Sequence, residues 1–234
     1  MSLGHATTPA DPAIIQAEPA TVVAAGIGTQ GALRSASFHL GPFVPGRTAV
    51  GIAGPQGAGK TALTDLLAGL TVPAHGKLRV LGEDLSCPAG RAAVRYRIGL
   101  VPQPAGRPPG FTVRQLVAHA GWLAGLPGHE QDLAVARALD SLGLADWANL
   151  PVRSVPEGTA RLTWLAAASV HEPELLLLDG VLDGMDDRDA VCVADAVRDA
   201  AMVTAVVVTG QDPERLERAC GHVLTLAQGV LTSG

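Results

Sequence analysis

The chain has 234 residues, 47% of them hydrophobic, and a formal net charge of −5 at pH 7. This length and composition suit one large α/β domain or a domain with a small subdomain, and the acidic balance gives no reason to expect a nucleic-acid partner. The three cysteines lie far apart, with no Cys-x-x-Cys or Cys/His metal pattern, which favours a reducing cytosol. No signal peptide or membrane-spanning stretch is evident, so any membrane association is expected to go through a partner.

The first part of the chain reads as a short lead followed by strands. Residues 1–20, which mix prolines with small residues, are expected to form a flexible N-terminal lead. Short apolar runs predict strands at 21–25, 32–40, 47–53 and 77–81. A polar stretch at 83–97 is expected to hold a short helix, a strand follows at 97–103, and the prolines and glycines of 104–110 predict a loop.

The middle of the chain changes character. Apolar residues at helical spacing predict two helices within 112–150 and a third at 159–170, which together form an insertion into the α/β pattern. The apolar runs at 175–179 and 205–209 predict two further buried strands. Strands that alternate with helices indicate a parallel, doubly wound sheet.

A glycine-rich loop carries the strongest chemical signal. Residues 54–61 read G-P-Q-G-A-G-K-T and fit G-x-x-x-x-G-K-[ST], the phosphate-binding loop, between a predicted strand and a predicted helix. Glycines let backbone N–H groups close around phosphate oxygens, and the positive N-terminus of the following helix faces the anion. We expect Lys60 to reach the β/γ-phosphates and the Thr61 hydroxyl to coordinate Mg²⁺. The predicted nucleotide-binding residues are Gly54, Pro55, Gln56, Gly57, Ala58, Gly59, Lys60, Thr61 and Ala62.

A phosphate loop needs a second element that holds the metal ion. Asp179 ends the apolar run L-L-L-L-D at 175–179, where an acidic residue would contact Mg²⁺ directly or through water. An aspartate after a buried strand can also be a helix cap or a loop residue, but the upstream phosphate loop favours the metal role.

From about residue 21 onward the chain resembles the ATP-binding domain of ABC transporters. R-I-G-L-V-P-Q at 97–103 resembles the family's Q-loop, which would make Gln103 the glutamine that senses metal and water. The run H-E-P-E-L-L-L-L-D at 171–179 is similar to the approach to the metal-site strand, and G-M-D at 184–186 resembles the D-loop that communicates between subunits. Two further segments, 122–126 and 141–146, resemble the drug- and ion-export subgroup.

The resemblance implies a P-loop NTPase fold: a RecA-like α/β core, a small antiparallel β subdomain and a helical subdomain at about 111–170, all within a domain of 21–234. It implies ATP or ADP as ligand, with Mg²⁺ held by Thr61, Gln103 and Asp179. It also implies two partners, a multi-span membrane permease and a second ATP-binding domain in a homo- or heterodimer. The expected location is the cytoplasm, peripheral on the cytoplasmic face of the inner membrane.

The sequence departs from the family pattern at the positions where the family carries its ATP-hydrolysis residues. Gly180 follows Asp179, where the family has the glutamate that polarises the attacking water, and losing a positioned base typically costs about 10²–10⁴-fold in rate. The signature motif L-S-G-G-Q corresponds to V-P-E-G-T at 155–159. Pro156 replaces the serine that binds the γ-phosphate, and Glu157 is expected to bring negative charge toward the opposing nucleotide.

Three further departures point the same way. Gly210 stands where the family has its switch histidine, and Ala62 replaces the second hydroxyl residue of the phosphate loop. No aromatic residue stands near 29–30, where the family stacks adenine. Together these losses predict a nucleotide-binding transporter subunit with weak or no ATPase activity and no catalytic residue of the usual kind.

Two alternatives stay open at this point. The chain could be a soluble regulatory or structural pseudo-ATPase that is not tied to transport. It could also be a working ATPase that uses a non-standard carboxylate, for which Asp183, Asp186 and Asp187 are the candidates just beyond Gly180.

Overall fold

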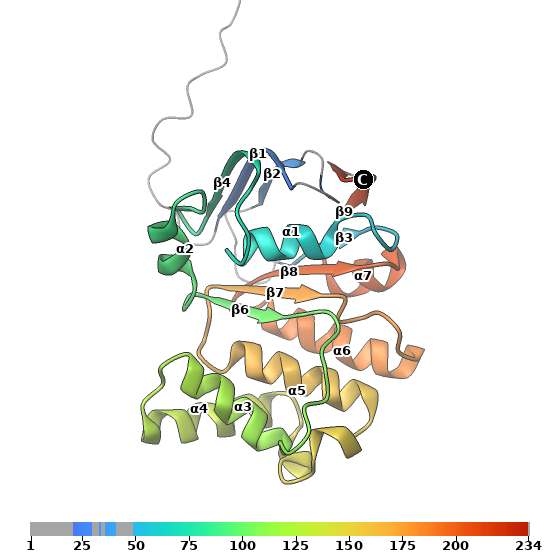
Figure 1. The fold of residues 1–234 in the computed structure, drawn as a ribbon. Helices are drawn as coiled ribbons and strands as arrows, with labels where there is room; N and C mark the ends of the chain where they lie inside the picture. Colours follow the sequence, from blue (N-terminus) through green and yellow to red (C-terminus); the bar gives the residue numbers. More distant parts are fainter. Residues whose placement is uncertain (1–20, 30–32, 34–35, 41–48, 234) are drawn as a thin grey trace, which may run out of the picture.

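The computed structural model describes residues 21–29, 33, 36–40 and 49–233 (Figure 1). The lead expected at 1–20 lies outside these residues, as do parts of the strands expected at 32–40 and 47–53. Within the described residues the chain forms two sheets with helices around them, in the α/β arrangement expected from the sequence.

The larger sheet has six strands, and five of them run parallel. Its strand order is β10-β9-β3-β8-β7-β6, and only the edge strand β10 pairs antiparallel, with β9. The strands are β3 (Ala49–Ala53), β6 (Ile98–Val101), β7 (Leu175–Asp179), β8 (Ala205–Gly210), β9 (His222–Ala227) and β10 (Val230–Ser233). All five residues of β7 are buried, because helices cover both faces of the sheet, and this explains why the strand reads as a continuous apolar run.

The smaller sheet has four strands and is antiparallel throughout, in the order β2-β1-β4-β5. Its strands are β1 (Val22–Gly28), β2 (Ala36–Leu40), β4 (His75–Val80) and β5 (Glu83–Asp84). Helix α1 (Lys60–Leu67) lies between this sheet and the six-stranded one, as Figure 1 shows, and its leucines join one hydrophobic cluster with residues of both sheets. The helix that begins at the phosphate loop is therefore anchored on two sides.

Helices cover the other face of the larger sheet. The elements there are α5 (Glu157–Ser169), α6 (Asp187–Ala200) and α7 (Pro213–Ala219), which share a second cluster with alternate residues of β7 and β8. Helices α3 (Val113–Leu123) and α4 (Gly128–Ser141) lie beside α5 at the bottom of Figure 1. The three helices pack around a third hydrophobic cluster. Helix α2 (Pro88–Val94) lies beside β5. No helix in the described part of the chain combines the length and apolarity that crossing a bilayer requires.

The parallel pairing fixes where the site lies. The carboxyl ends of β3, β7 and β8 meet at one edge of the sheet, with Ala53 paired to Gly210 and Asp179 paired to Thr209. Ligands of open α/β sheets bind outside this edge. The phosphate loop, Asp179 and Gly210 are therefore brought together by the sheet register alone.

Candidate nucleotide-binding site

The phosphate loop owes its shape to three glycines with different constraints. Gly57 and Gly59 have φ of 79° and 102°, a left-handed conformation that favours glycine. Gly59 is also the residue that precedes α1. At Gly54 a Cβ would lie 2.4 Å from the carbonyl oxygen of Leu226, so any side chain there would clash with β9. Around Gly57 a Cβ would meet nothing within 4 Å, which leaves open space over the loop for a ligand.

Lys60 is the buried cation of the loop. Its side chain is 7% exposed, and Nζ donates hydrogen bonds to the carbonyl oxygens of Gly54, at 2.6 Å, and Pro55, at 3.0 Å. These bonds use two of the three ammonium donors, so the third can serve a phosphate oxygen. Burial lowers the pKa of Lys60, while the charges of Asp183 and Asp179 oppose that shift. The lysine is therefore desolvated and faces two carboxylates.

Asp179 is held at the end of β7 by its neighbour strand. It is 1% exposed, and its Oδ1 accepts a hydrogen bond from the Thr209 hydroxyl. The same hydroxyl oxygen accepts from the backbone N–H of Gly180 at 3.2 Å. This arrangement fixes the carboxylate at the carboxyl edge of the sheet, close enough to Lys60 to influence its pKa.

The expected metal ligands fit a hard cation that keeps most of its water. Thr61 lies in the first turn of α1, and Gln103 follows β6, the strand beside β7. One carboxylate, one amide and one hydroxyl are the oxygen donors that Mg²⁺ takes when phosphates and water complete its shell. Among the described residues, no group of three or more His, Cys, Asp or Glu side chains could hold a metal ion without such help. The metal role of Thr61, Gln103 and Asp179 stays a prediction.

Gly180 has no room for the side chain that its position carries in the family. Its φ is +61°, and a Cβ there would lie 2.5 Å from Nε2 and 2.6 Å from Cδ of Gln103. The Gln103 side chain thus covers the backbone where a glutamate would begin. The flexible end of Gln103 could shift to admit a larger residue at 180, so the positive φ is the stronger constraint on that position.

Asp183 approaches the site from the loop after β7. Its Oδ1 accepts the backbone N–H of Gln211 at 3.0 Å and would lie 3.4 Å from a Cβ at Gly210. Its Oδ2 is buried and has no hydrogen-bond partner among the described residues. The other two candidate bases are engaged elsewhere. Asp186 caps the N-terminus of α6, and Asp187 pairs with Arg215 at 2.8 Å.

The signature-like loop is locked by contacts within the chain. Glu157 pairs with Arg107 at 2.6 Å and with Arg161 at 2.9 Å. The hydrogen bond from Arg107 is the main reason why the pKa of Glu157 lies below its usual value. Two guanidinium groups therefore balance the negative charge of Glu157 within the chain, and its effect on an opposing nucleotide stays a prediction.

A second contact occupies a backbone donor of the same loop. Pro156, the residue before α5, offers no side-chain cap, and the N–H of Gly158 donates instead to Oδ2 of Asp189 at 2.8 Å. A Cβ at Gly158 would lie 2.7 Å from Cγ of Asp189, so the glycine is needed for this approach. A backbone donor in the first turn of α5 is thus bound to a carboxylate of α6. Sequence reasoning missed Asp189, since it lies 31 residues from Gly158.

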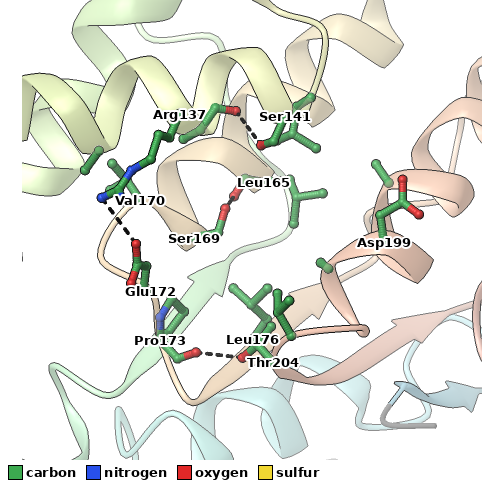
Figure 2. A pocket seen from close by; sticks show the side chains of 16 residues that line it. Arg137, Ser141, Leu165, Ser169, Val170, Glu172, Pro173, Leu176, Asp199 and Thr204 are labelled. Atoms are coloured by element: carbon green, nitrogen blue, oxygen red, sulfur yellow. Dashed lines mark hydrogen bonds and ion pairs between the residues drawn. The ribbon is translucent and has the colours of Figure 1, made fainter. Parts of the chain in front are cut away.

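A cavity of about 650 Å³ lies elsewhere, between α4, α5 and α6 (Figure 2). Arg137 and Glu172 form an ion pair of 3.3 Å at its side. The hydroxyls of Ser141 and Ser169 donate to carbonyl oxygens of their own helices, so they are not free to hold a phosphate. This cavity is lined by the amino-terminal end of β7, at Leu176, and not by the phosphate loop. It does not contribute to the candidate site.

A parallel sheet whose carboxyl edge carries a glycine-rich loop, a buried lysine and a strand-end aspartate defines a P-loop nucleotide-binding fold. Residues 42–182 match the family model described as ABC transporter. The chain is 32% identical over 180 residues to Nod factor export ATP-binding protein I of Sinorhizobium fredii, covering 76% of this chain and 52% of that protein. It is 31% identical over 194 residues to the protein of that name in Burkholderia thailandensis, covering 82% and 62%. The chain belongs to the ABC transporter family and is homologous to its ATP-binding subunits.

Solved structures share the fold. CbiO1 from Clostridium perfringens, part of the ABC transporter complex cbiONQ, aligns with a TM-score of 0.80 at 20% identity, covering 92% of this chain and 87% of that one. The dimeric structure of MJ0796, a bacterial ABC transporter cassette, aligns with a TM-score of 0.76 at 18% identity, covering 90% and 96%. The expected P-loop NTPase fold is therefore confirmed, while the chain spans only about half to three-fifths of the curated relatives' length.

Proposed function

We propose that this chain is the ATP-binding subunit of an ABC-type transporter that binds nucleotide with Mg²⁺ and hydrolyses ATP slowly or not at all. The observation that carries the proposal is Gly180, a glycine with a φ of +61° at the position where the family has its general base. A glycine cannot orient water or accept its proton. Its φ of +61° also disfavours any larger residue at this position. Loss of the base is thus supported by the shape of the site as well as by the residue type.

Binding rests on groups that remain in place. The backbone of residues 54–61 surrounds the phosphates, Lys60 meets the β- or γ-phosphate, and Asp179 with Thr61 and Gln103 holds the cation. When bound, Mg²⁺ would neutralise part of the phosphate charge. Lys60 is already desolvated beside Gly54 and Pro55, so its charge acts in a low dielectric, where a phosphate contact is stronger than in water.

The signature-like loop supports the same conclusion from the other side of the domain. In the family, the resemblance implies, this loop contacts ATP held by the opposite subunit. Here Pro156 has no N–H to donate, and the N–H of Gly158 is taken by Asp189. A facing nucleotide would have to displace Asp189 before it could bind that donor, so closure of two subunits on ATP is disfavoured.

We propose a membrane permease and a second ATP-binding domain as partners, at the cytoplasmic face of the inner membrane. ABC ATP-binding subunits work in this way as a class. The relatives named above are export proteins, and the export-like segments at 122–126 and 141–146 support an export role for this chain. The cargo itself belongs to the membrane partner.

Calorimetric titration of Mg-ATP and Mg-ADP into the purified chain tests the binding half of this proposal. The matched control is Lys60→Ala, which removes the buried ammonium and leaves the glycine framework intact. Binding by the wild type that disappears in the variant would support the proposal. Absence of binding in both proteins would contradict it and show that the phosphate loop no longer binds nucleotide.

A further inference from the structure

We propose that this site selects nucleoside diphosphate over nucleoside triphosphate, and that Asp183 is the residue that disfavours the terminal phosphate. The inference rests on the proposed nucleotide binding and adds a specificity to it. It starts from one orphaned atom: Oδ2 of Asp183 is buried and has no hydrogen-bond partner among the described residues. Buried polar atoms without a partner are rare in native proteins and call for an explanation.

The Asp183 carboxylate is fixed in position by its other oxygen. Oδ1 accepts the N–H of Gln211, the residue after β8, at 3.0 Å. The backbone of Gly210 in turn accepts the N–H of Gly54 at 3.0 Å, so the loop that carries Asp183 is tied through β8 to the first residue of the phosphate loop. Asp183 therefore stands beside the phosphate loop and cannot swing freely into solvent.

The same carboxylate faces the cation of the site. Its charge, like that of Asp179, the expected metal ligand, opposes the lowering of the Lys60 pKa by burial, so both carboxylates lie near the ammonium group. Lys60 is the residue expected to meet the β- and γ-phosphates. An ionised carboxylate is a hydrogen-bond acceptor only, so Oδ2 has no proton to offer a phosphate oxygen. The two anions can only repel each other.

The charges at the site then predict different affinities for nucleoside diphosphate and nucleoside triphosphate. The ammonium group of Lys60 faces two carboxylates, Asp179 and Asp183. A triphosphate carries about one negative charge more than a diphosphate, and that charge sits on the phosphate beyond the loop. Gly180 and Gly210 carry no side chain that could offset this charge, and Arg107 and Arg161 pair with Glu157. Repulsion between like charges in a partly buried site is expected to cost at least about tenfold in affinity.

Calorimetric titration of ADP and ATP, each with Mg²⁺, into the wild type and Asp183→Asn tests the inference. The expected result is a wild type that binds ADP at least about tenfold more tightly than ATP. In Asp183→Asn the ATP affinity should rise until the two are within about threefold, while the ADP affinity changes by less than about twofold. Asparagine keeps an oxygen for the N–H of Gln211, removes the charge and puts an NH2 group in place of Oδ2.

Two controls keep the result interpretable. Asp140→Asn removes the same charge from an exposed position on α4 and should leave the ADP-to-ATP ratio unchanged. Asp183→Ser serves if the asparagine variant does not fold, because its hydroxyl oxygen can still accept a hydrogen bond while the carboxylate is gone.

Three outcomes would overturn the inference. They are equal wild-type affinities for ADP and ATP, a preference that persists in both Asp183 variants, and a loss of ATP binding in Asp183→Asn, which would make Asp183 a ligand. Failure of the proposed function would give a different set of titration results. In that case neither nucleotide binds the wild type, or Lys60→Ala binds both as well as the wild type does.

Discussion

The side chain of Gln103 lies against the backbone of Gly180, so close that a Cβ at 180 would be 2.5 Å from its Nε2. The glutamine of the segment that resembles the Q-loop thus lies against the residue that follows the metal-site strand. Because Gly180 also has a φ of +61°, the chain has adapted its backbone to the absence of a side chain. The local backbone at 180 therefore suits a glycine and not the glutamate that the family has there.

Restoring the glutamate should not restore ATPase activity. Gly180→Glu would place a non-glycine residue in a left-handed conformation and force Gln103 to move, at a cost of about 1–3 kcal/mol in the free energy of unfolding. We expect ATP turnover to change by less than about twofold, because Gly210 and Pro156 still stand where the family has its switch histidine and signature serine. Urea denaturation and a phosphate-release assay measure the two quantities. Gly180→Ala is the matched control, with the same backbone cost and no carboxylate. A rise in turnover of about 10²-fold in Gly180→Glu alone would show that the missing base is the only defect.

Asp189 should stabilise the fold through the N-terminus of α5. Asp189→Ala leaves the N–H of Gly158 without its 2.8 Å partner, and losing a partner of a partly buried donor typically costs about 1–2 kcal/mol. Asp195→Ala on the same helix removes an exposed aspartate that pairs only with Arg198 in an i,i+3 contact, so it should cost less than about 0.5 kcal/mol. Chemical denaturation compares the two. Equal losses would mean that the Asp189 contact adds nothing beyond surface charge.

Glu157 should make stability depend on acidity. Its pKa is lowered in the folded protein, mainly by the hydrogen bond from Arg107, so its contribution is present above its ordinary pKa of 4.5 and is lost as pH falls through the lowered value. Glu157→Gln should therefore be less stable than the wild type at pH 7, by about 0.5–1 kcal/mol for this partly exposed pair. The difference should vanish in strong acid. Thermal unfolding across pH 2–7 measures it, and a difference that stays constant with pH would show that the ion pairs are not its cause.

Bound nucleotide should stabilise the native state. At a ligand concentration of about 100 Kd the gain is about 2.7 kcal/mol, or roughly 5–10 °C in Tm for a chain of this size. The gain should disappear in Lys60→Ala. Hydrogen exchange then separates two of the functional readings. Protection confined to residues 54–61 favours a structural ligand, whereas protection that spreads to α3, α4 and α5 favours signalling between the site and those helices.

Local sequence patterns predicted most of the fold and the phosphate loop, because each rests on a short contiguous segment. The run at 175–179 is buried on both faces, and the glycines at 57 and 59 have the backbone conformation that their loop requires. The pairing of Glu157 with Arg161 could have been read from its i,i+4 spacing.

The contacts that set the state of the site could not be read in this way. Arg107 lies 50 residues from Glu157, and Asp189 lies 31 residues from Gly158. Only the packing of α5 against α6 and against the loop after β6 brings these groups together. The orphaned oxygen of Asp183 likewise depends on the loop after β7 meeting the end of β8. A sequence pattern names such residues but does not give their partners.

Steady-state turnover of saturating Mg-ATP by the purified chain, with Lys60→Ala beside it, tests the central claim most directly. The account predicts that the wild type releases phosphate at the background rate of the variant, although it binds nucleotide and the variant does not. Turnover well above background that disappears in Lys60→Ala would contradict it. In that case Asp183→Asn would show at once whether the remaining carboxylate beside the phosphate loop is the base.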